Sequence, residues 1–420
     1  MSMRSVAATP VVVIGAGIVG AATAFELQRR GRSVVLVDRG EPGRGCSFGN
    51  LASIAVTEFL PASRPSIWAQ IPKWLLDPEG PVRVRPTYLP RLVPWLFRFL
   101  LASRRSKLRE LEDAGAALCA RVHDDTTTLL SAAGLLAMLS ATGCLSLYAS
   151  DAEVAADHDH LEVIRRYGIA HQKLDREEIA ALEPAISPTI KQAVLFPENR
   201  TIADPYALVV ALVDRVVRMG GRLEAGNVVA LERAADGQIG GVRLDDGRRV
   251  NAGAVVVAAG AYSARLSKTI GEPIPLETER GYHTQIMDAG VTLRHSIIWP
   301  SRAFMVSPVA GGIRVGGTVE MAGLEAPADY RRAKIVVERA REALPGLQVR
   351  QASEWMGHRP ALPDTVPIIG PSAKVRGVYY ATGHGHLGLT YAATTARIIG
   401  DLMMGQRPSL DVAPYRIDRF

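Results

Sequence analysis

Short runs of consecutive apolar residues recur along the chain and end near glycine. Val11–Ile14 leads directly into Gly15, and Ala254–Val257 is followed by Ala258, Ala259 and then Gly260. A strand that is apolar at every position is buried on both faces, as in a parallel sheet covered on both sides. We therefore expect Ala254–Val257 to return to the sheet that Val11–Ile14 begins.

Helical patterns lie between the expected strands. Asp204 and Pro205 predict a helix start, as N-cap and first helical residue, and Gly220-Gly221 predicts its end. Apolar residues at helical spacing predict further helices within residues 104–140, 161–182, 329–344 and about 389–404.

Shorter strand-like segments bounded by turn residues such as Gly311-Gly312 predict a second sheet. Its expected strands are Cys144–Tyr148, Gln192–Phe196, His283–Met287, Phe304–Pro308 and Ile313–Gly316. Further strands are expected at Val228–Glu232 and Gly241–Leu244, joined through Asp236-Gly237, and at Val378–Ala381.

The order of these elements predicts two interleaved α/β domains, since no repeat or low-complexity linker separates them. We expect a Rossmann-like domain from residues 1–50, 198–265 and 356–420. The substrate domain, with a mixed or antiparallel sheet, is expected from residues 51–197 and 266–355.

Composition agrees with a large folded chain: of 420 residues, 48% are hydrophobic and 22% charged, which excludes a disordered or collagen-like protein. Three scattered cysteines are too few for a disulfide framework or a thiolate zinc site, which favours a reducing compartment. A net charge of +7 favours anionic surfaces or substrates without identifying them.

We expect a cytoplasmic protein. Val11–Ile14 is followed by glycines rather than by a cleavage site. The longest apolar stretch elsewhere, Leu92–Leu101, contains Pro94 and Arg98 and is shorter than the ~20 residues that span a bilayer.

A glycine-rich turn follows the first strand and opens a helix. Gly15 permits the tight turn, Gly17 lets a pyrophosphate approach the helix N-terminus, and Gly20 lets the helix pack close to the strand. Asp38 ends the next strand and can bind a ribose hydroxyl pair. The pattern predicts dinucleotide binding, with an ordinary glycine turn as the alternative, and it fits NAD or FAD.

A polar, glycine-rich segment, residues 43–50, follows Asp38. It is either a loop that wraps the rest of a long cofactor or an ordinary surface loop. A third glycine-rich strand-to-helix junction lies at Gly383–Thr390.

These motifs together resemble a known family. Five motifs follow one another along the chain: the glycine turn with Asp38, the Ser47-Phe48-Gly49-Asn50 loop, Ala258-Ala259-Gly260, Gly357-His358-Arg359-Pro360 with Pro367–Gly370, and Gly383–Thr390. In this the chain resembles the D-amino acid dehydrogenase branch of the FAD-dependent D-amino-acid oxidase family, over about residues 11–405.

The resemblance implies FAD rather than NAD. The flavin would be held by the loops at Ser47–Asn50 and Gly383–Thr390, with the helix dipole near Leu389 directed at its pyrimidine edge. The expected cofactor contacts are Gly15, Gly17, Ile18, Val19, Gly20, Asp38, Arg39, Ser47, Asn50, Val229, Ala259, Gly260, Gly383, His386, Leu387, Gly388, Leu389 and Thr390. Covalently flavinylated relatives carry histidine near the Asn50 position, so noncovalent FAD is expected. The loop departs from the family pattern after Asn50, where it continues as Leu51-Ala52-Ser53.

Arg359 is the expected substrate residue. The arginine of the matching motif binds the amino acid carboxylate, for which a planar guanidinium fork is suited; a surface salt bridge is the alternative. Tyr282 resembles an aromatic residue that lines the pocket, or is a half-buried strand residue. His384, with His386, would contact the substrate amine or a flavin carbonyl; two histidines without a nearby carboxylate or thiolate make a poor metal site, and we expect no metal.

The resemblance implies oxidative deamination of a D-amino acid, D-proline and hydroxylated D-proline included, to an imino acid or a 2-oxo acid. The α-hydrogen leaves as hydride to the flavin, no protein nucleophile is required, and no general base is assigned. Dehydrogenases of this branch pass electrons to a quinone or another respiratory acceptor. The alternatives are an oxygen-using glycine or sarcosine oxidase-like enzyme, and an RNA-modifying flavoprotein.

A nucleic-acid partner is not expected, because acidic residues are mixed among the basic ones. Two basic and apolar stretches, Lys73–Leu76 and Arg91–Lys107 with Trp95, Phe97 and Phe99, are candidates for a peripheral contact with the inner membrane. A lid or a core helix is the alternative.

Overall fold

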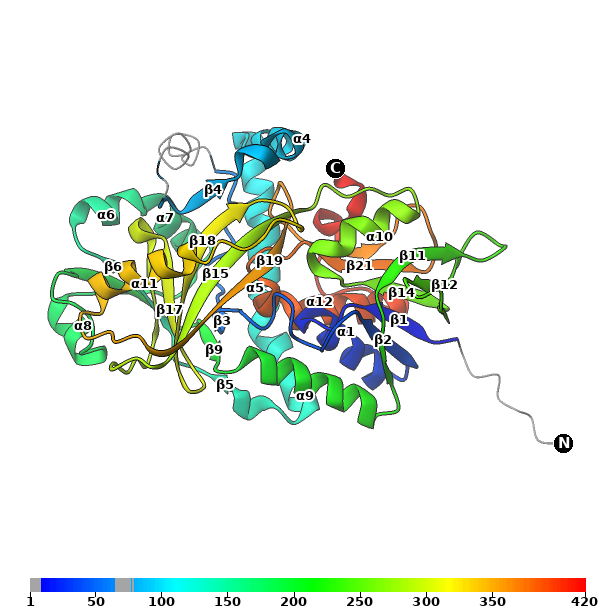
Figure 1. The fold of residues 1–420 in the computed structure, drawn as a ribbon, viewed down its shortest axis with the longest axis horizontal. Helices are drawn as coiled ribbons and strands as arrows, with labels where there is room; N and C mark the ends of the chain where they lie inside the picture. Colours follow the sequence, from blue (N-terminus) through cyan, green and yellow to red (C-terminus); the bar gives the residue numbers. More distant parts are fainter. Residues whose placement is uncertain (1–8, 65–76, 78) are drawn as a thin grey trace.

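A computed structural model describes residues 9–64, 77 and 79–420. Figure 1 shows two lobes side by side, with the first sheet in one lobe and the larger second sheet in the other. The first sheet has six strands, parallel except for the edge strand β20. Its order is β10 (Arg222–Ala225), β2 (Val34–Asp38), β1 (Val11–Ile14), β14 (Ala254–Val257), β21 (Val378–Thr382) and β20 (Ile368–Pro371).

Alternate residues of these strands enter two separate cores, which explains their unbroken apolar runs. Val11 and Val13 of β1 pack in the core that holds helices α1 (Ile18–Arg29), α9 (Pro205–Arg218) and α12 (Gly388–Met403). Val12 and Ile14 face the opposite core. That side is covered by helix α10 (Ser263–Thr269) and by a small sheet of β11 (Val228–Arg233), β12 (Ile239–Leu244) and β13 (Arg249–Asn251).

The second sheet is mostly antiparallel and forms the other lobe. Its order is β19 (Arg350–Ala361), β15 (Glu277–Asp288), β18 (Gly312–Met321), β17 (Phe304–Val309), β16 (Ser296–Trp299), β6 (Cys144–Tyr148), β8 (Gln192–Phe196) and β7 (Gln172–Leu174), and β4 (Val82–Val84) also pairs with β18. Its core includes residues of α8 (Arg176–Leu182) and α11 (Arg331–Ala343).

The long helix α5 (Arg105–Ala133) runs between the lobes in Figure 1 and contributes Leu118 and Val122 to the core of α1 and α12. Helix α4 (Leu89–Ala102) precedes it. The remaining described elements are helices α6 (Asp151–Ala156) and α7 (His158–Arg166) and a small sheet of β3 (Ser53–Ile54), β9 (Arg200–Ile202) and β5 (Leu139–Ser140).

Most expected elements occur within a few residues of their predicted bounds. Asp204 caps α9 by accepting a hydrogen bond from the Ala207 amide. The one or two helices expected over residues 161–182 occur as two, α7 and α8, and strand β7, which was not expected, lies between them. The expected domain boundary at residue 356 falls inside β19, which continues in the second sheet to Ala361.

Within the described ranges, no helix has the length and apolar character needed to cross a bilayer. The Lys73–Leu76 segment lies outside the described residues. The expected patch at residues 91–107 is corrected in part: Trp95 and Phe99 are buried and stacked on each other, while Phe97 is exposed. The stacked rings pack beside Met321 and Ala361 in a small core of their own.

Candidate active site

One cavity of about 1110 Å³ lies between the two lobes and takes lining residues from both sheets. It extends from Asp38 at the end of β2 to the loop before α12. Every residue predicted to bind cofactor or substrate lines it, except Gly20 and Gly383. Gly383 lines a smaller adjoining cavity of about 50 Å³.

The first glycine turn is shaped by close backbone approaches. Gly15 has a φ of +103°, and a Cβ there would overlap the carbonyl oxygen of Ala258. A Cβ at Gly20 would overlap the carbonyl oxygen of Gly15, so Gly20 serves the packing of α1 rather than the cavity wall. The amide of Ile18 donates to Ser47 Oγ at 2.9 Å, which places Ser47 at the N-terminus of α1.

Asp38 is fixed at the far end of the cavity. Its Oδ2 accepts from the Ala16 amide at 2.6 Å and its Oδ1 from the Gly40 amide at 2.9 Å. Both oxygens keep lone pairs for the hydroxyls of a ribose. Nearby, Arg39 stacks on the ring of Tyr262 with Cζ 3.6 Å from the centroid, and Val229 of β11 lines the cavity.

The Ser47–Asn50 loop is held from the second sheet. Arg314 of β18, only 6% exposed, donates to the carbonyls of Phe48 and Asn50. The ring of His283 on β15 is hydrogen-bonded to the Gly49 carbonyl at 3.1 Å. Burial and the charge of Arg314 lower the pKa of His283 to about 3, so the ring is neutral and donates this bond.

A long dinucleotide fits these residues. The glycine turn leaves backbone amides at the start of α1 for a pyrophosphate, and Asp38 lies where the adenosine ribose would be. At the other end, Oδ1 of Asn50 is buried and has no hydrogen-bond partner in the described part of the chain. A flavin edge can supply that partner, because its ring carries N–H groups.

The loop before α12 forms the opposite wall. Gly385 has a φ of +53°, and Leu387 is the residue before the first turn of the helix. Thr390 Oγ1 accepts from the Ala55 amide at 3.1 Å, which ties this turn to the segment after β3. The partial positive charge at the N-terminus of α12 is therefore presented to the cavity.

Arg359 lies on β19 with its guanidinium packed flat against Gly281 of β15. Any Cβ at Gly281 would overlap the guanidinium carbon. Nη1 donates to the Thr318 carbonyl at 3.2 Å, and within the described ranges Arg359 has no carboxylate partner. The remaining donors are available to an anion in the cavity.

Thr318 is strained at the point where it meets Arg359. Its φ is +60°, in the left-handed region that costs a non-glycine residue about 1–3 kcal/mol. The strain accompanies a register shift between β15 and β18 at Arg280 and Tyr282. The hydroxyl of Thr318 is buried beside the cavity and unpartnered among the described residues.

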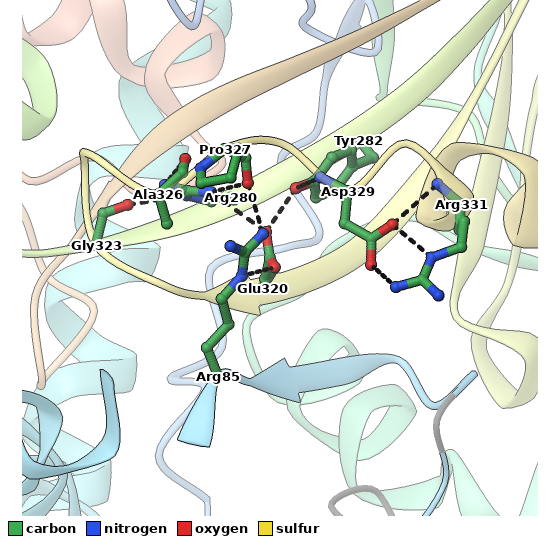
Figure 2. Close-up of polar contacts among 9 residues, drawn as sticks. All are labelled: Arg85, Arg280, Tyr282, Glu320, Gly323, Ala326, Pro327, Asp329 and Arg331. Atoms are coloured by element: carbon green, nitrogen blue, oxygen red, sulfur yellow. Dashed lines mark hydrogen bonds and ion pairs between the residues drawn. The ribbon is translucent and has the colours of Figure 1, made fainter. Parts of the chain in front are cut away.

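Tyr282 lies on β15, and its hydroxyl belongs to a polar network. The residue lines the cavity, but its hydroxyl donates to Glu320 at 2.5 Å and accepts from the Asp329 amide at 3.0 Å (Figure 2). Burial and Glu320 raise the pKa of Tyr282 to about 12, so the phenol keeps its proton. Because both hydrogen-bonding directions of the hydroxyl are in use, direct contact between it and substrate is not favoured.

The two loop histidines differ in environment. His384 is 4% exposed, and its Nε2 is 2.9 Å from Thr395 Oγ1. Burial lowers the pKa of His384 to about 3, so this ring is neutral. His386 is exposed to the cavity, and the surrounding protein together with Arg359 lowers its pKa.

Sequence reasoning did not assign roles to Arg314, His283, Trp355 or Glu279. Trp355 stacks on His283 and occupies the space that side chains at Gly49 and Gly357 would need. Two features of the sequence could have drawn attention to them: Arg314 is a charged residue within an apolar strand, and Glu279 is a charged residue in the strand segment Glu279–His283. Neither could be placed without the register of β15 with β18 and β19.

The fold and the cavity define a two-lobed, dinucleotide-binding oxidoreductase architecture. The model of the DAO family of FAD-dependent oxidoreductases matches residues 10–402, and the chain belongs to that family. FAD is its cofactor, and the group accepts a hydride when bound.

Relatives of similar length match almost the whole chain. A D-amino-acid oxidase of Bradyrhizobium diazoefficiens is 33% identical over 98% of each chain. A D-amino acid dehydrogenase of Rhizobium johnstonii is 30% identical over 98% of this chain and 99% of the relative.

Solved structures show the same fold. L-proline dehydrogenase from P. horikoshii superposes with a TM-score of 0.74 at 20% identity, covering 98% of this chain and 97% of that one. Glycine oxidase from Geobacillus kaustophilus superposes with a TM-score of 0.71 at 20% identity, covering 98% of this chain and 99% of that one.

Proposed function

We propose that this chain oxidises D-amino acids, with D-proline and hydroxylated D-proline among the candidates, to imino or 2-oxo acids. The observation that carries the proposal is the guanidinium of Arg359, which faces the shared cavity without a carboxylate partner among the described residues. Arg359 is half-buried, and a cation partly withdrawn from water is stabilised when a ligand supplies an anion. The names of the two relatives support a D-amino acid as that ligand.

In this proposal the protein mainly positions the substrate. Arg359 binds the carboxylate with two hydrogen bonds, because Gly281 leaves room for the guanidinium to lie flat. The shared cavity takes lining residues from both lobes, so a substrate held by Arg359 would share it with the flavin. The glycine turn, Asp38 and the loop before α12 would hold FAD, which would supply the hydride acceptor for the α-hydrogen. Hydrolysis of the imino acid by water would then give the 2-oxo acid.

The test is anaerobic bleaching of the bound flavin by a panel of D- and L-amino acids, prolines and sarcosine. We expect bleaching by D-amino acids. No bleaching by any member would refute the proposal, and bleaching by sarcosine or glycine alone would favour an oxidase of small amines instead.

We propose a quinone or another respiratory carrier as electron acceptor. The relative named as an oxidase makes oxygen the specific alternative. Reoxidation of the reduced enzyme by a soluble quinone, compared with air-saturated buffer, separates the two. A quinone rate well above the oxygen rate is expected, and the reverse order would assign an oxidase.

We also propose that α4 attaches this protein peripherally to the cytoplasmic face of the inner membrane. Leu89, Val93, Phe97 and Leu100 are 44–60% exposed and follow helical spacing on one face. Arg104 and Arg105 lie exposed just beyond it, so an apolar stripe adjoins positive charge.

Co-sedimentation with anionic vesicles tests this. The parent should sediment with the vesicles, and a variant with Phe97→Ser, Arg104→Gln and Arg105→Gln should remain in the supernatant with its flavin content unchanged. A parent that does not sediment would end this proposal.

A further inference from the structure

A carboxylate lies opposite the proposed carboxylate-binding arginine. Glu279 of β15 and Arg359 of β19 are directly paired in the antiparallel register, so their side chains share one face of the sheet. Both line the large cavity. The site therefore presents one positive and one negative group on neighbouring strands.

Glu279 is not neutralised by that arginine. The guanidinium of Arg359 packs over Gly281, and no ion pair joins it to Glu279. Across residues 9–64, 77 and 79–420, the carboxylate of Glu279 has no hydrogen bond or ion pair.

Three other glutamates on or beside the second sheet have partners. Glu320 pairs with Arg85 at 2.6 Å, and Glu183 accepts from the Arg294 amide at 2.8 Å. Glu277, two residues before Glu279 on the same strand, accepts from the Tyr88 hydroxyl at 2.8 Å. Because a carboxylate withdrawn from water is costly without a partner, the unpartnered Glu279 calls for a ligand.

We infer that Glu279 binds the ammonium group of the substrate, so that Arg359 and Glu279 together receive the two charges of a zwitterionic amino acid. This inference rests on the proposed function. It assigns to the cavity a second charged contact with substrate, made from the strand next to the one that carries Arg359. The ammonium is either the α-amine or a side-chain amine, and the experiment below distinguishes them.

Where the α-amine is bound, Glu279 also has a chemical role. Its carboxylate takes one proton from the ammonium, which leaves a neutral amine and a neutral carboxylic acid. The α-C–H bond then breaks with its electron pair passing to FAD as hydride, while the nitrogen lone pair forms the C=N bond of an iminium. Charge and atoms balance, and the only oxidant is FAD.

The surroundings of Glu279 suit a proton acceptor. Burial raises the pKa of Glu279, and Arg359 opposes that effect. Glu277 adds negative charge from the same strand. The adjoining small cavity brings Glu58, His384 and His386 near the same carboxylate. The acceptor must be ionised, so flavin reduction should rise as the pH increases through the pKa of Glu279.

The experiment compares Glu279→Gln with Glu277→Gln in the flavin-loaded protein. Anaerobic stopped-flow reduction by D-alanine and D-lysine gives the dissociation constant and limiting rate for each. Propanoate, which has a carboxylate and no amine, is titrated by its effect on the flavin spectrum. The pH dependence of the limiting rate is recorded for each protein.

We expect Glu279→Gln to raise the dissociation constant of D-alanine at least tenfold and to change that of propanoate less than twofold. The acid-side ionisation should disappear from the pH dependence of the limiting rate. Glu277→Gln should match the parent in the dissociation constants and limiting rates, with the acid-side ionisation kept and moved only to a lower pH, because the charge of Glu277 no longer raises the pKa of Glu279. Glu279→Asp should recover part of the preference for amine over propanoate. Equal losses for both amino acids assign the α-amine, and a loss confined to D-lysine assigns a side-chain amine.

Unchanged amino acid binding in Glu279→Gln, or an equal loss of propanoate binding, would overturn the inference. If instead the parent flavin is reduced by no D-amino acid, the proposed function itself fails, and this result is read from the parent alone. Flavin content and thermal midpoint of each variant verify folding.

Discussion

The position of Arg359 depends on two neighbouring residues, Gly281 and Thr318. Gly281 has no side chain, so the guanidinium lies against backbone, and Thr318 offers a carbonyl only because its φ is +60°. At the scale of single residues, the site combines an unpaired cation with a strained backbone that aims one acceptor at it. Strain of this kind persists only where the surrounding structure enforces it.

Arg359→Ala should lower the affinity for substrate carboxylate by roughly 2–5 kcal/mol, the range for truncating one member of a buried charge pair. Arg359→Lys should recover only part of this, because an ammonium cannot make the planar double contact. Spectral titration with propanoate measures both. Arg331→Ala, which removes an exposed arginine paired with Asp329, is the control, and an affinity unchanged in Arg359→Ala would remove this residue from the site.

His384 should make the protein less stable in acid. Its pKa is about 3 in the folded chain and about 6.5 when unfolded, so below pH 6.5 the unfolded state binds the extra proton. The stability it contributes is complete above pH 6.5 and decreases as the pH falls towards 3, by about 2 kcal/mol at pH 5. Thermal midpoints at pH 7.5 and 5 should differ less in His384→Asn than in the parent. An equal acid shift in both proteins would contradict this assignment.

At the scale of elements, a buried polar network joins β15 and β18 to the loop that follows them. Arg280 is fully buried and donates to the carbonyls of Gly323, Ala326 and Pro327, and Glu320 lies between Arg280 and Arg85 (Figure 2). The network lies at the register shift between β15 and β18. Arg280 and Tyr282 are on the face of β15 opposite to that of Glu279 and its partner Arg359, because successive residues of a strand point to opposite faces.

Glu320→Gln should destabilise the fold by about 3–5 kcal/mol, because two arginines would lose their buried anion. We expect a lower thermal midpoint and faster proteolysis within residues 322–330. Glu325→Gln, which breaks only an exposed pair with Arg265, should leave both unchanged. Equal midpoints for Glu320→Gln and the parent would show that the network does not hold this loop.

The sequence predicts elements better than it predicts contacts between them. Strand β1, the glycine turn and the capped start of α9 depend on local patterns, and all three occur as expected. The interruption by β7 and the burial of Trp95 were missed, since both depend on partners distant in the chain. The meeting of Glu279 with Arg359 depends likewise on the register of two strands separated by more than sixty residues.

At the scale of the whole molecule, interleaved segments close one cavity from two sides. The first sheet contributes the glycine turn and Asp38, and the second contributes Arg359 and Glu279. A ligand that fills the cavity must therefore contact both lobes. Because binding to the folded state alone stabilises it by RT ln(1 + [L]/Kd), FAD should tighten the lobes together.

Hydrogen exchange of the protein with and without FAD measures this coupling. Addition of FAD should slow amide exchange both at residues 15–20 of the first sheet and at residues 314–318 and 355–359 of the second. Residues 172–182, at the far edge of the second sheet, should exchange at the same rate in both states, because they line no part of the large cavity. Protection confined to residues 15–20 and their own lobe would mean that FAD is held by the first sheet alone.

Since we expect noncovalent attachment, denaturation should also release all the flavin from the polypeptide, and flavin that stays with the denatured chain would contradict that expectation.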